Sequence, residues 1–284
     1  MGSGFRFTSG GTLPSSLHSP PRMLSSSRAF IVVCDGSFAS DFDGPGPDCP
    51  AIHSVALDGS SGFYTFDTPS SIPLVMQLLG CSAIGGAVSG FPEGTGDTFS
   101  ARYHGLKCAL FSTDAPTLEA HRAYLEPRAL LTQDATAAAA AAVAADAHVV
   151  VLHLAQRCFP SQTRLLSFAN DILSALPTAP EPLLGFAILS SEPLHSLQSV
   201  DSAADSSRPW KPLQSYMFHN AALVPHSCVR AAIAMRHSAS VRRDLCRAFS
   251  LAAARDSGAL CTTRACHFPR ELSFDFGFLS KYGA

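Results

Sequence analysis

The sequence predicts an α/β fold in which about five pseudo-symmetric strand–turn–helix modules are arranged in a ring. Two observations lead to this expectation. Three segments of the chain share one order: an apolar run, a turn that contains proline, and a stretch with helical periodicity. With 284 residues, of which 46% are hydrophobic and 15% charged, the chain is also long and apolar enough to bury a substantial core.

The three repeated segments justify strands and helices in turn. Their apolar runs are rich in β-branched and aromatic residues, which is typical of buried strands, and cover 105–111, 148–154 and 216–224. Each run is followed by a turn that combines proline with Ser or Thr, residues that end a strand and cap a helix. We therefore expect the helices to cover 118–125, 162–176 and 228–235.

Further strands are expected between these segments. Apolar runs bounded by glycine-rich turns cover 30–34, 52–57, 63–66, 81–88 and 184–189. The alanine run 135–145 is a strong helix former. Two stretches rich in Gly, Pro, Ser and Asp, near 91–100 and 192–213, are expected to be exposed insertions. We therefore expect one domain over 29–284 that carries these two insertions.

Residues 1–28 have a composition of their own. They contain no Asp or Glu, carry Arg6, Arg22 and Arg28, and are crowded with serine, glycine and proline. This composition is typical of an organellar transit peptide, and a disordered tail has a similar one. We expect a mitochondrial protein, with a cytoplasmic or nucleolar location as the alternative.

Charge and cysteine content narrow the function. The net charge of −2 argues against a protein that binds DNA or RNA mainly through phosphates. No apolar stretch of about 18 residues is present, so we expect no insertion into a membrane. None of the nine cysteines forms a CxxC pair, and the spacing of Cys261, Cys266 and His267 fits no standard zinc pattern. We expect reduced, mostly buried thiols and neither a metal nor a cofactor.

Several segments resemble translation initiation factor 6, a ribosomal anti-association factor. Residues 52–66, in which a strand and a glycine turn lead into Phe63 and Tyr64, are similar to its first repeat. Further segments similar to the family follow in the same order as in the family, at 72–75, 79–85, 104–106, 113–121 and 215–226. The chain departs from the family at Ser82 and Gly86, where the family carries arginines, and its fifth repeat is short. The resemblance implies a pentein-type α/β propeller.

The same resemblance implies a function that is not enzymatic. Such a protein would bind the large ribosomal subunit through a ribosomal protein and nearby rRNA, and would be a monomer when free. It would act in maturation of that subunit or prevent premature joining of the small one. The candidate ribosome-binding residues are Tyr64, Phe66, His219 and Asn220.

Two alternatives remain open beside this interpretation. Pentein folds also include guanidine-modifying enzymes with a cysteine nucleophile, for which the candidates here are Cys261 or Cys266, His219 or His226, and Asp97, Asp114 or Asp134. The other alternative is a structural subunit of an organellar assembly.

A third pattern would suit a different chemistry. Asp35 follows the apolar run 30–34, and an aspartate at a strand end is a magnesium ligand in some nucleases and phosphatases. Such a site needs a second carboxylate, and the nearby Asp41, Asp43 and Asp48 lie in a Gly–Pro loop. An Asp–Gly turn is therefore the preferred interpretation of Asp35 and Gly36.

Overall fold

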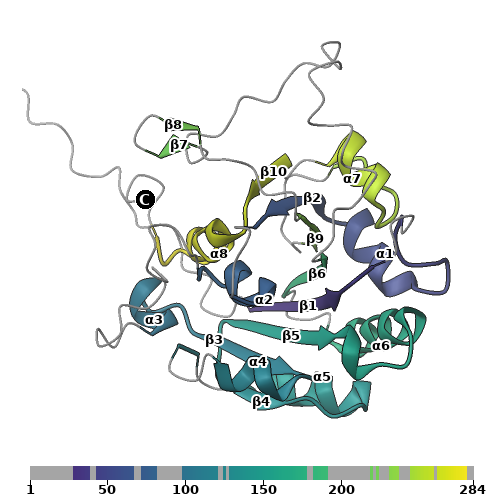
Figure 1. The fold of residues 1–284 in the computed structure, drawn as a ribbon, viewed down its shortest axis with the longest axis horizontal. Helices are drawn as coiled ribbons and strands as arrows, with labels where there is room; N and C mark the ends of the chain where they lie inside the picture. The colour runs from purple at the N-terminus through teal and green to yellow at the C-terminus, as the bar shows by residue number, and fades with distance from the viewer. Residues whose placement is uncertain are drawn as a thin grey trace, which may run out of the picture.

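A computed structural model shows one mixed β-sheet with helices on both faces (Figure 1). The structure describes residues 28–38, 43–66, 72–81, 98–120, 124–125, 128–177, 182–190, 218–219, 222–223, 230–236, 244–258 and 261–279. Among these residues, no helix has the length and apolar character needed to cross a membrane.

Eight strands form the sheet in the order β10-β2-β9-β6-β1-β5-β3-β4. They are β1 (Ala29–Gly36), β2 (Ser60–Thr65), β3 (Cys108–Ser112), β4 (Arg128–Leu130), β5 (Val149–Ala155), β6 (Leu183–Ser190), β9 (Arg230–Arg236) and β10 (Cys261–Arg264). The pairs are parallel except those of β9, which runs antiparallel to both of its neighbours, β2 and β6. A separate antiparallel pair consists of β7 (Phe218–His219) and β8 (Ala222–Leu223).

The helices divide between two apolar cores, one on each face of the sheet. The first core includes residues of α1 (Pro50–Leu57), α5 (Ala135–Ala144), α6 (Gln162–Ala175) and α7 (Leu251–Ser257). The second includes residues of α2 (Leu74–Leu78), α3 (Phe99–Arg102), α4 (Ala115–Ala120) and α8 (Phe268–Asp275). The described residues also include two short 3₁₀ helices, η1 (Gln156–Cys158) and η4 (Ala265–His267).

Strand β1 lies near the centre of the sheet and separates the two cores. Phe30, Val32 and Cys34 join the first core, while Ile31 and Val33 join the second. Successive side chains of a strand point to opposite faces, so both faces of β1 are buried and its sequence is a continuous apolar run. By the same alternation, the next odd position, Asp35, belongs to the face of the second core, where the apolar run ends.

The expected ring of five modules is not supported. Within the described residues the sheet is open, with β10 and β4 as its two edges. The strand–turn–helix order is confirmed twice, in β3–α4 and in β5–η1–α6, but the third expected helix is wrong because 230–236 forms strand β9. In a sheet, the apolar run of β9 is buried between two neighbouring strands, so its helical spacing was a coincidence of composition.

A second correction concerns 52–57, which was expected to be a strand and lies in helix α1. Pro50 is in its first turn, where the missing N–H costs no hydrogen bond. Ile52, Val55 and Ala56 follow helical spacing and are buried, whereas Leu57 is 52% exposed. Most of the expected strand 81–88, most of the insertion near 91–100 and all of the insertion 192–213 lie outside the described residues, as do residues 1–27.

Candidate functional site

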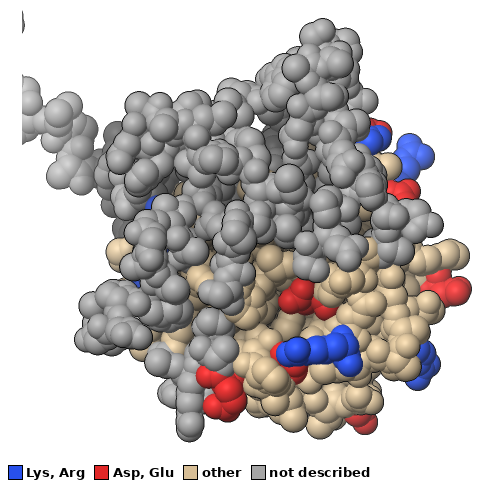
Figure 2. All heavy atoms as spheres, in the orientation of Figure 1, with Lys and Arg blue, Asp and Glu red and all other residues tan. Residues whose placement is uncertain are grey.

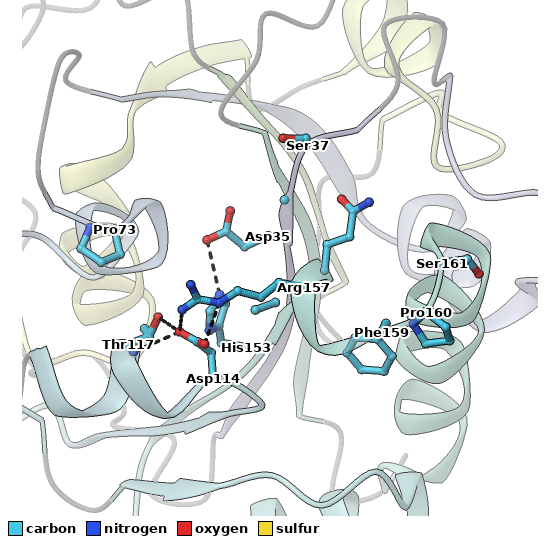
Figure 3. Close-up of a pocket in the computed structure, with 13 residues that line it drawn as sticks. Asp35, Ser37, Pro73, Asp114, Thr117, His153, Arg157, Phe159, Pro160 and Ser161 are labelled. Carbon is cyan, nitrogen blue, oxygen red and sulfur yellow. Dashed lines mark hydrogen bonds and ion pairs between the residues drawn. The ribbon is translucent and has the colours of Figure 1, made fainter.

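A cavity of about 590 Å³ opens where β1, β3 and β5 end (Figure 3). Parallel strands bring their carboxyl ends to one edge of a sheet, where the following loops provide polar groups. Asp35 comes from the end of β1, Asp114 follows β3, and His153 and Arg157 come from β5 and η1. Ser161, which caps α6 by accepting a hydrogen bond from the Arg164 amide, also lines the cavity.

Asp35 and His153 form the deepest polar pair of the cavity. They lie on adjacent parallel strands, in which Val33 is the register partner of His153. Asp35 Oδ2 lies 3.4 Å from His153 Nε2, and the side chains are 23% and 2% exposed, respectively. His153 Nε2 is buried against this carboxylate, so Asp35 is the member of the pair that reaches the cavity.

The other ring nitrogen of His153 is held by Ser112. Ser112 is the register partner of His153 across β3 and β5, and its Oγ lies 2.8 Å from His153 Nδ1. The same hydroxyl accepts a hydrogen bond from the Asp114 amide at 3.0 Å. Ser112 is fully buried, so it orients the imidazole and is not exposed to a ligand.

Asp114 is tied to both a helix and an arginine. Its carboxylate accepts the Thr117 amide at 3.0 Å and the Thr117 hydroxyl at 2.5 Å, which caps the start of α4. It also accepts two hydrogen bonds from Arg157, to Oδ1 at 2.8 Å and to Oδ2 at 2.5 Å. Burial raises the pKa of Asp114, but the hydrogen bonds from Arg157 and Thr117 outweigh it and hold that pKa below its ordinary value.

Arg157 covers this carboxylate from the solvent side. Its side chain is 63% exposed while that of Asp114 is 5% exposed. The hydrogen bonds to Asp114 are the main reason that the pKa of Arg157 is raised, and the charge of Asp35 raises it further. In the space-filling view, a basic side chain lies beside acidic ones near the ends of β1 and β5 (Figure 2). The guanidinium is thus a fixed positive charge at the cavity mouth.

Neither a model of a known protein family nor the sequence of a curated protein matches the chain. Some solved structures do match the chain. The PH0037 protein from Pyrococcus horikoshii is 12% identical, with a TM-score of 0.58 over 91% of this chain and 99% of that one. The cofactor-independent phosphoglycerate mutase from Thermoplasma acidophilum is 9% identical, with a TM-score of 0.55 over 88% of this chain and 100% of the mutase. At these identities the likeness shows a shared fold and nothing more.

These findings overturn the resemblance to initiation factor 6. The chain shares its fold with the two solved structures, and its described residues form an open sheet and not a ring, so the expected family and the ribosome-binding function were wrong. The expectation of a protein that is not an enzyme is also contradicted, since a mutase carries this fold. The short similar segments reflect common strand and turn composition, which different α/β folds share.

Of the predicted ribosome-binding residues, the two whose side chains the structure describes, Tyr64 and Phe66, do not line the cavity. Tyr64 and Phe66 are 1% and 2% exposed and belong to the second core, because β2 is covered on that face. His219 lies in β7, and Asn220 lies outside the described residues. Nothing else in the structure tests their role.

The guanidine-modifying alternative is not favoured either. Cys261 lies in β10, Cys266 lies in η4 and Asp134 caps α5, and neither Cys266 nor Asp134 lines the cavity. His226 and Asp97 lie outside the described residues. Among the candidates whose side chains the structure describes, only Asp114 lines the cavity. The seven described free cysteines include five buried ones, in line with the expected buried thiols.

The sequence contains one signal for this candidate site. Asp35 is an aspartate at a strand end, but the carboxylates close to it in the sequence lie in a Gly–Pro loop, which favoured the interpretation as an Asp–Gly turn. The second carboxylate is Asp114, which the sheet brings to the same edge because both β1 and β3 flank β5. His153 and Arg157 carried no sequence signal of their own.

Proposed function

We propose that this chain is an enzyme that hydrolyses or transfers the phosphoryl group of a small phosphate ester bound in the cavity. The observation that carries the proposal is the Asp35 carboxylate, which is paired with His153 and lines the same cavity as the exposed guanidinium of Arg157. A structure of the same fold is a phosphoglycerate mutase, an enzyme that acts on a phosphate ester. The volume of about 590 Å³ is within the usual range for small-molecule sites.

Arg157 supplies the positive charge for the phosphate. A guanidinium has five N–H donors, and Asp114 takes one from Nε and one from Nη2. The remaining donors are available to phosphate oxygens, which Arg recognises with a planar fork of hydrogen bonds. Charge that develops on these oxygens in the transition state is stabilised most by such a preorganised cation. Ser161 places the amino end of α6 at the same cavity, and its amides add to the positive potential.

Asp35 is the catalytic base in this proposal. Its carboxylate takes a proton from a water molecule, or from an acceptor alcohol, as the oxygen of that molecule forms a bond to phosphorus. The bond between phosphorus and the ester oxygen breaks, and Asp35 returns the proton to the leaving oxygen. His153 is a positioning residue, since its Nδ1 is fixed by Ser112 and its Nε2 faces the Asp35 carboxylate.

A divalent cation is common in phosphoryl transfer, and it needs several protein ligands that face one point. Among the described residues, no three His, Cys, Asp or Glu side chains are arranged to hold an ion. Both oxygens of Asp114 already accept hydrogen bonds from Arg157. The residues therefore do not fit a metal centre in this arrangement, and no step above depends on one.

The test is a release assay for inorganic phosphate with the full-length chain. Substrates would include p-nitrophenyl phosphate, the phosphoglycerates, sugar phosphates and nucleoside monophosphates. We expect turnover of at least one ester and a loss of about 100-fold or more in Asp35→Asn. The matched control is Asp48→Asn, because Asp48 is an exposed carboxylate that does not line the cavity.

Two outcomes would contradict the proposal. One is the absence of turnover and of binding for every ester, with binding followed by calorimetry. The other is an equally high turnover in Asp35→Asn and in Asp48→Asn, because the chemistry would then lie outside this cavity.

A further inference from the structure

The cavity has an apolar wall that the proposed chemistry does not use. Phe159, Pro160 and Pro73 line the cavity together with the charged groups of Asp35 and Arg157. We infer that the substrate is a phosphate ester whose organic part is an uncharged, flat ring, and that Phe159 selects it. The inference rests on the proposed function for the place of the phosphate, but it can be tested by binding alone.

Phe159 is held in a fixed position by helix α6. Its ring packs on that of Phe168, with the ring centroids 5.4 Å apart and the ring planes at 45°. Its amide donates a hydrogen bond to the Gln156 carbonyl at 2.9 Å, which fixes the backbone at the end of η1. Phe159 is half-buried, so the residue packs against the first core and also lines the cavity. An aromatic side chain that is already ordered binds a flat ring at a small cost in conformational entropy.

The apolar wall lies beside the place proposed for the phosphate. In the close-up view, Phe159 and Pro160 lie on one side of Arg157, and Asp114 and Thr117 lie on the other (Figure 3). Pro160 is exposed, so the wall continues toward the solvent. A phosphate bound at Arg157 would therefore have its ester group along this wall, where a ring gains affinity because apolar surface is removed from water.

The charges of the cavity disfavour a second anionic group on the substrate. Among the described residues that line it, Arg157 is the only Lys or Arg, whereas Asp35 and Asp114 are both acidic. Arg157 already donates two hydrogen bonds to Asp114, so its remaining donors serve one phosphate and leave no cation for a carboxylate. A carboxylate beside Asp35 would lose its hydration and meet a like charge, which lowers affinity. The cavity should therefore reject the phosphoglycerates, although a phosphoglycerate mutase has the same fold.

Three phosphonates test the inference, because their carbon–phosphorus bond permits binding to be measured without turnover. Calorimetry at pH 8 would compare phenylphosphonate, which has a ring, with methylphosphonate, which has none, and with phosphonoacetate, which adds a carboxylate. We expect phenylphosphonate to bind the wild-type protein at least about tenfold more tightly than methylphosphonate does. Phosphonoacetate should bind more weakly than methylphosphonate.

Substitution of Phe159 tests its role in this preference. Phe159→Ala should reduce the preference for phenylphosphonate over methylphosphonate to less than about threefold. Both affinities are measured on one protein, so their ratio is not changed by a fraction of unfolded chains. Phe159→Leu keeps an apolar contact with Phe168 and should give an intermediate ratio, which serves as the test if Phe159→Ala does not fold. The matched control is Phe274→Ala, which should keep the wild-type ratio because Phe274 is 46% exposed and does not line the cavity.

Three results would overturn the inference. They are equal binding of phenylphosphonate and methylphosphonate, binding of phosphonoacetate as tight as that of phenylphosphonate, and a wild-type ratio in both Phe159 variants. Selective binding of phenylphosphonate can occur in a chain that turns over no ester, and turnover that depends on Asp35 can occur with an adverse order of the three affinities. The failure of one proposal is therefore distinct from the failure of the other.

Discussion

Ser112 Oγ and His153 Nδ1 lie 2.8 Å apart across strands β3 and β5, and this contact fixes which ring nitrogen faces Asp35. Because Ser112 is buried and its hydroxyl also accepts the Asp114 amide, the contact links both carboxylates of the cavity. The parallel register of the strands, and not a flexible loop, determines the orientation of the imidazole. The first prediction follows from this link.

Ser112→Ala should lower both stability and activity. Removal of the hydroxyl leaves the Asp114 amide and His153 Nδ1 without a partner, which costs about 1–3 kcal/mol of unfolding free energy in a buried site. The imidazole also loses its orientation toward Asp35, so the pH dependence of turnover should change as well as its rate. Urea unfolding and a pH–rate profile measure the two effects. An unchanged profile with lowered stability would limit Ser112 to a structural role.

Gly36→Ala should disturb the cavity directly. A Cβ at Gly36 would collide with the side chain of Gln156, at 2.5 Å from its Cβ, and this near part of the side chain cannot rotate away. We expect a loss of about 1–3 kcal/mol and a shift of η1. Gly46→Ala is the matched control, because a Cβ there meets nothing within 4 Å. Equal unfolding midpoints in urea for the two variants would contradict the predicted packing.

Asp114→Asn should change the acid stability of the protein. The pKa of Asp114 is lowered in the folded state, so its carboxylate contributes stability at pH values above its unfolded pKa of 3.8. This contribution is lost as the pH falls through the lower folded pKa. The wild type should therefore exceed Asp114→Asn in unfolding free energy at pH 6, and the difference should shrink below pH 3.8. A difference that stays constant between pH 6 and 2.5 would show that charge is not the cause. Denaturant unfolding at several pH values measures it.

Glu271→Gln should have the opposite pH dependence. Burial raises the pKa of Glu271, although the hydrogen bond from the Tyr64 hydroxyl lowers it in part. A carboxyl with a raised folded pKa contributes its stability below the unfolded value of 4.5 and loses it as the pH rises through the folded pKa. The variant should therefore gain stability relative to wild type at pH 7 to 8 and lose that advantage near pH 4. Glu119→Gln, which changes an exposed residue of α4, should show no such crossover.

Local patterns in the sequence were sufficient for the central parallel strands. The apolar runs behind β1, β5 and β6 were found because strands buried on both faces are continuously apolar. Helix α6 was found because its apolar stripe and its Ser161 cap are both local signals. These signals lie within one element and need no knowledge of its neighbours.

The errors lie where neighbours decide the outcome. The segment 52–57 was expected to be a strand because it is a short apolar run before a glycine turn, but it forms helix α1, whose buried residues pack in the first core. Segment 230–236 has helical spacing, yet two strand partners make it β9. The site followed the same rule, because Asp35 and Asp114 are far apart in the chain and meet only through the order of the sheet.

The reversed strand β9 has a consequence for how the chain is made. Strand β2 pairs only with β9 and β10, both of which are synthesised much later. Roughly 165 residues separate the end of β2 from the start of β9, which corresponds to about 8–30 s of translation. During that interval the backbone of β2 has no native partner, and an unpaired strand is an aggregation hazard. The nascent chain should therefore depend on protection of residues 60–65 until β9 has left the ribosome.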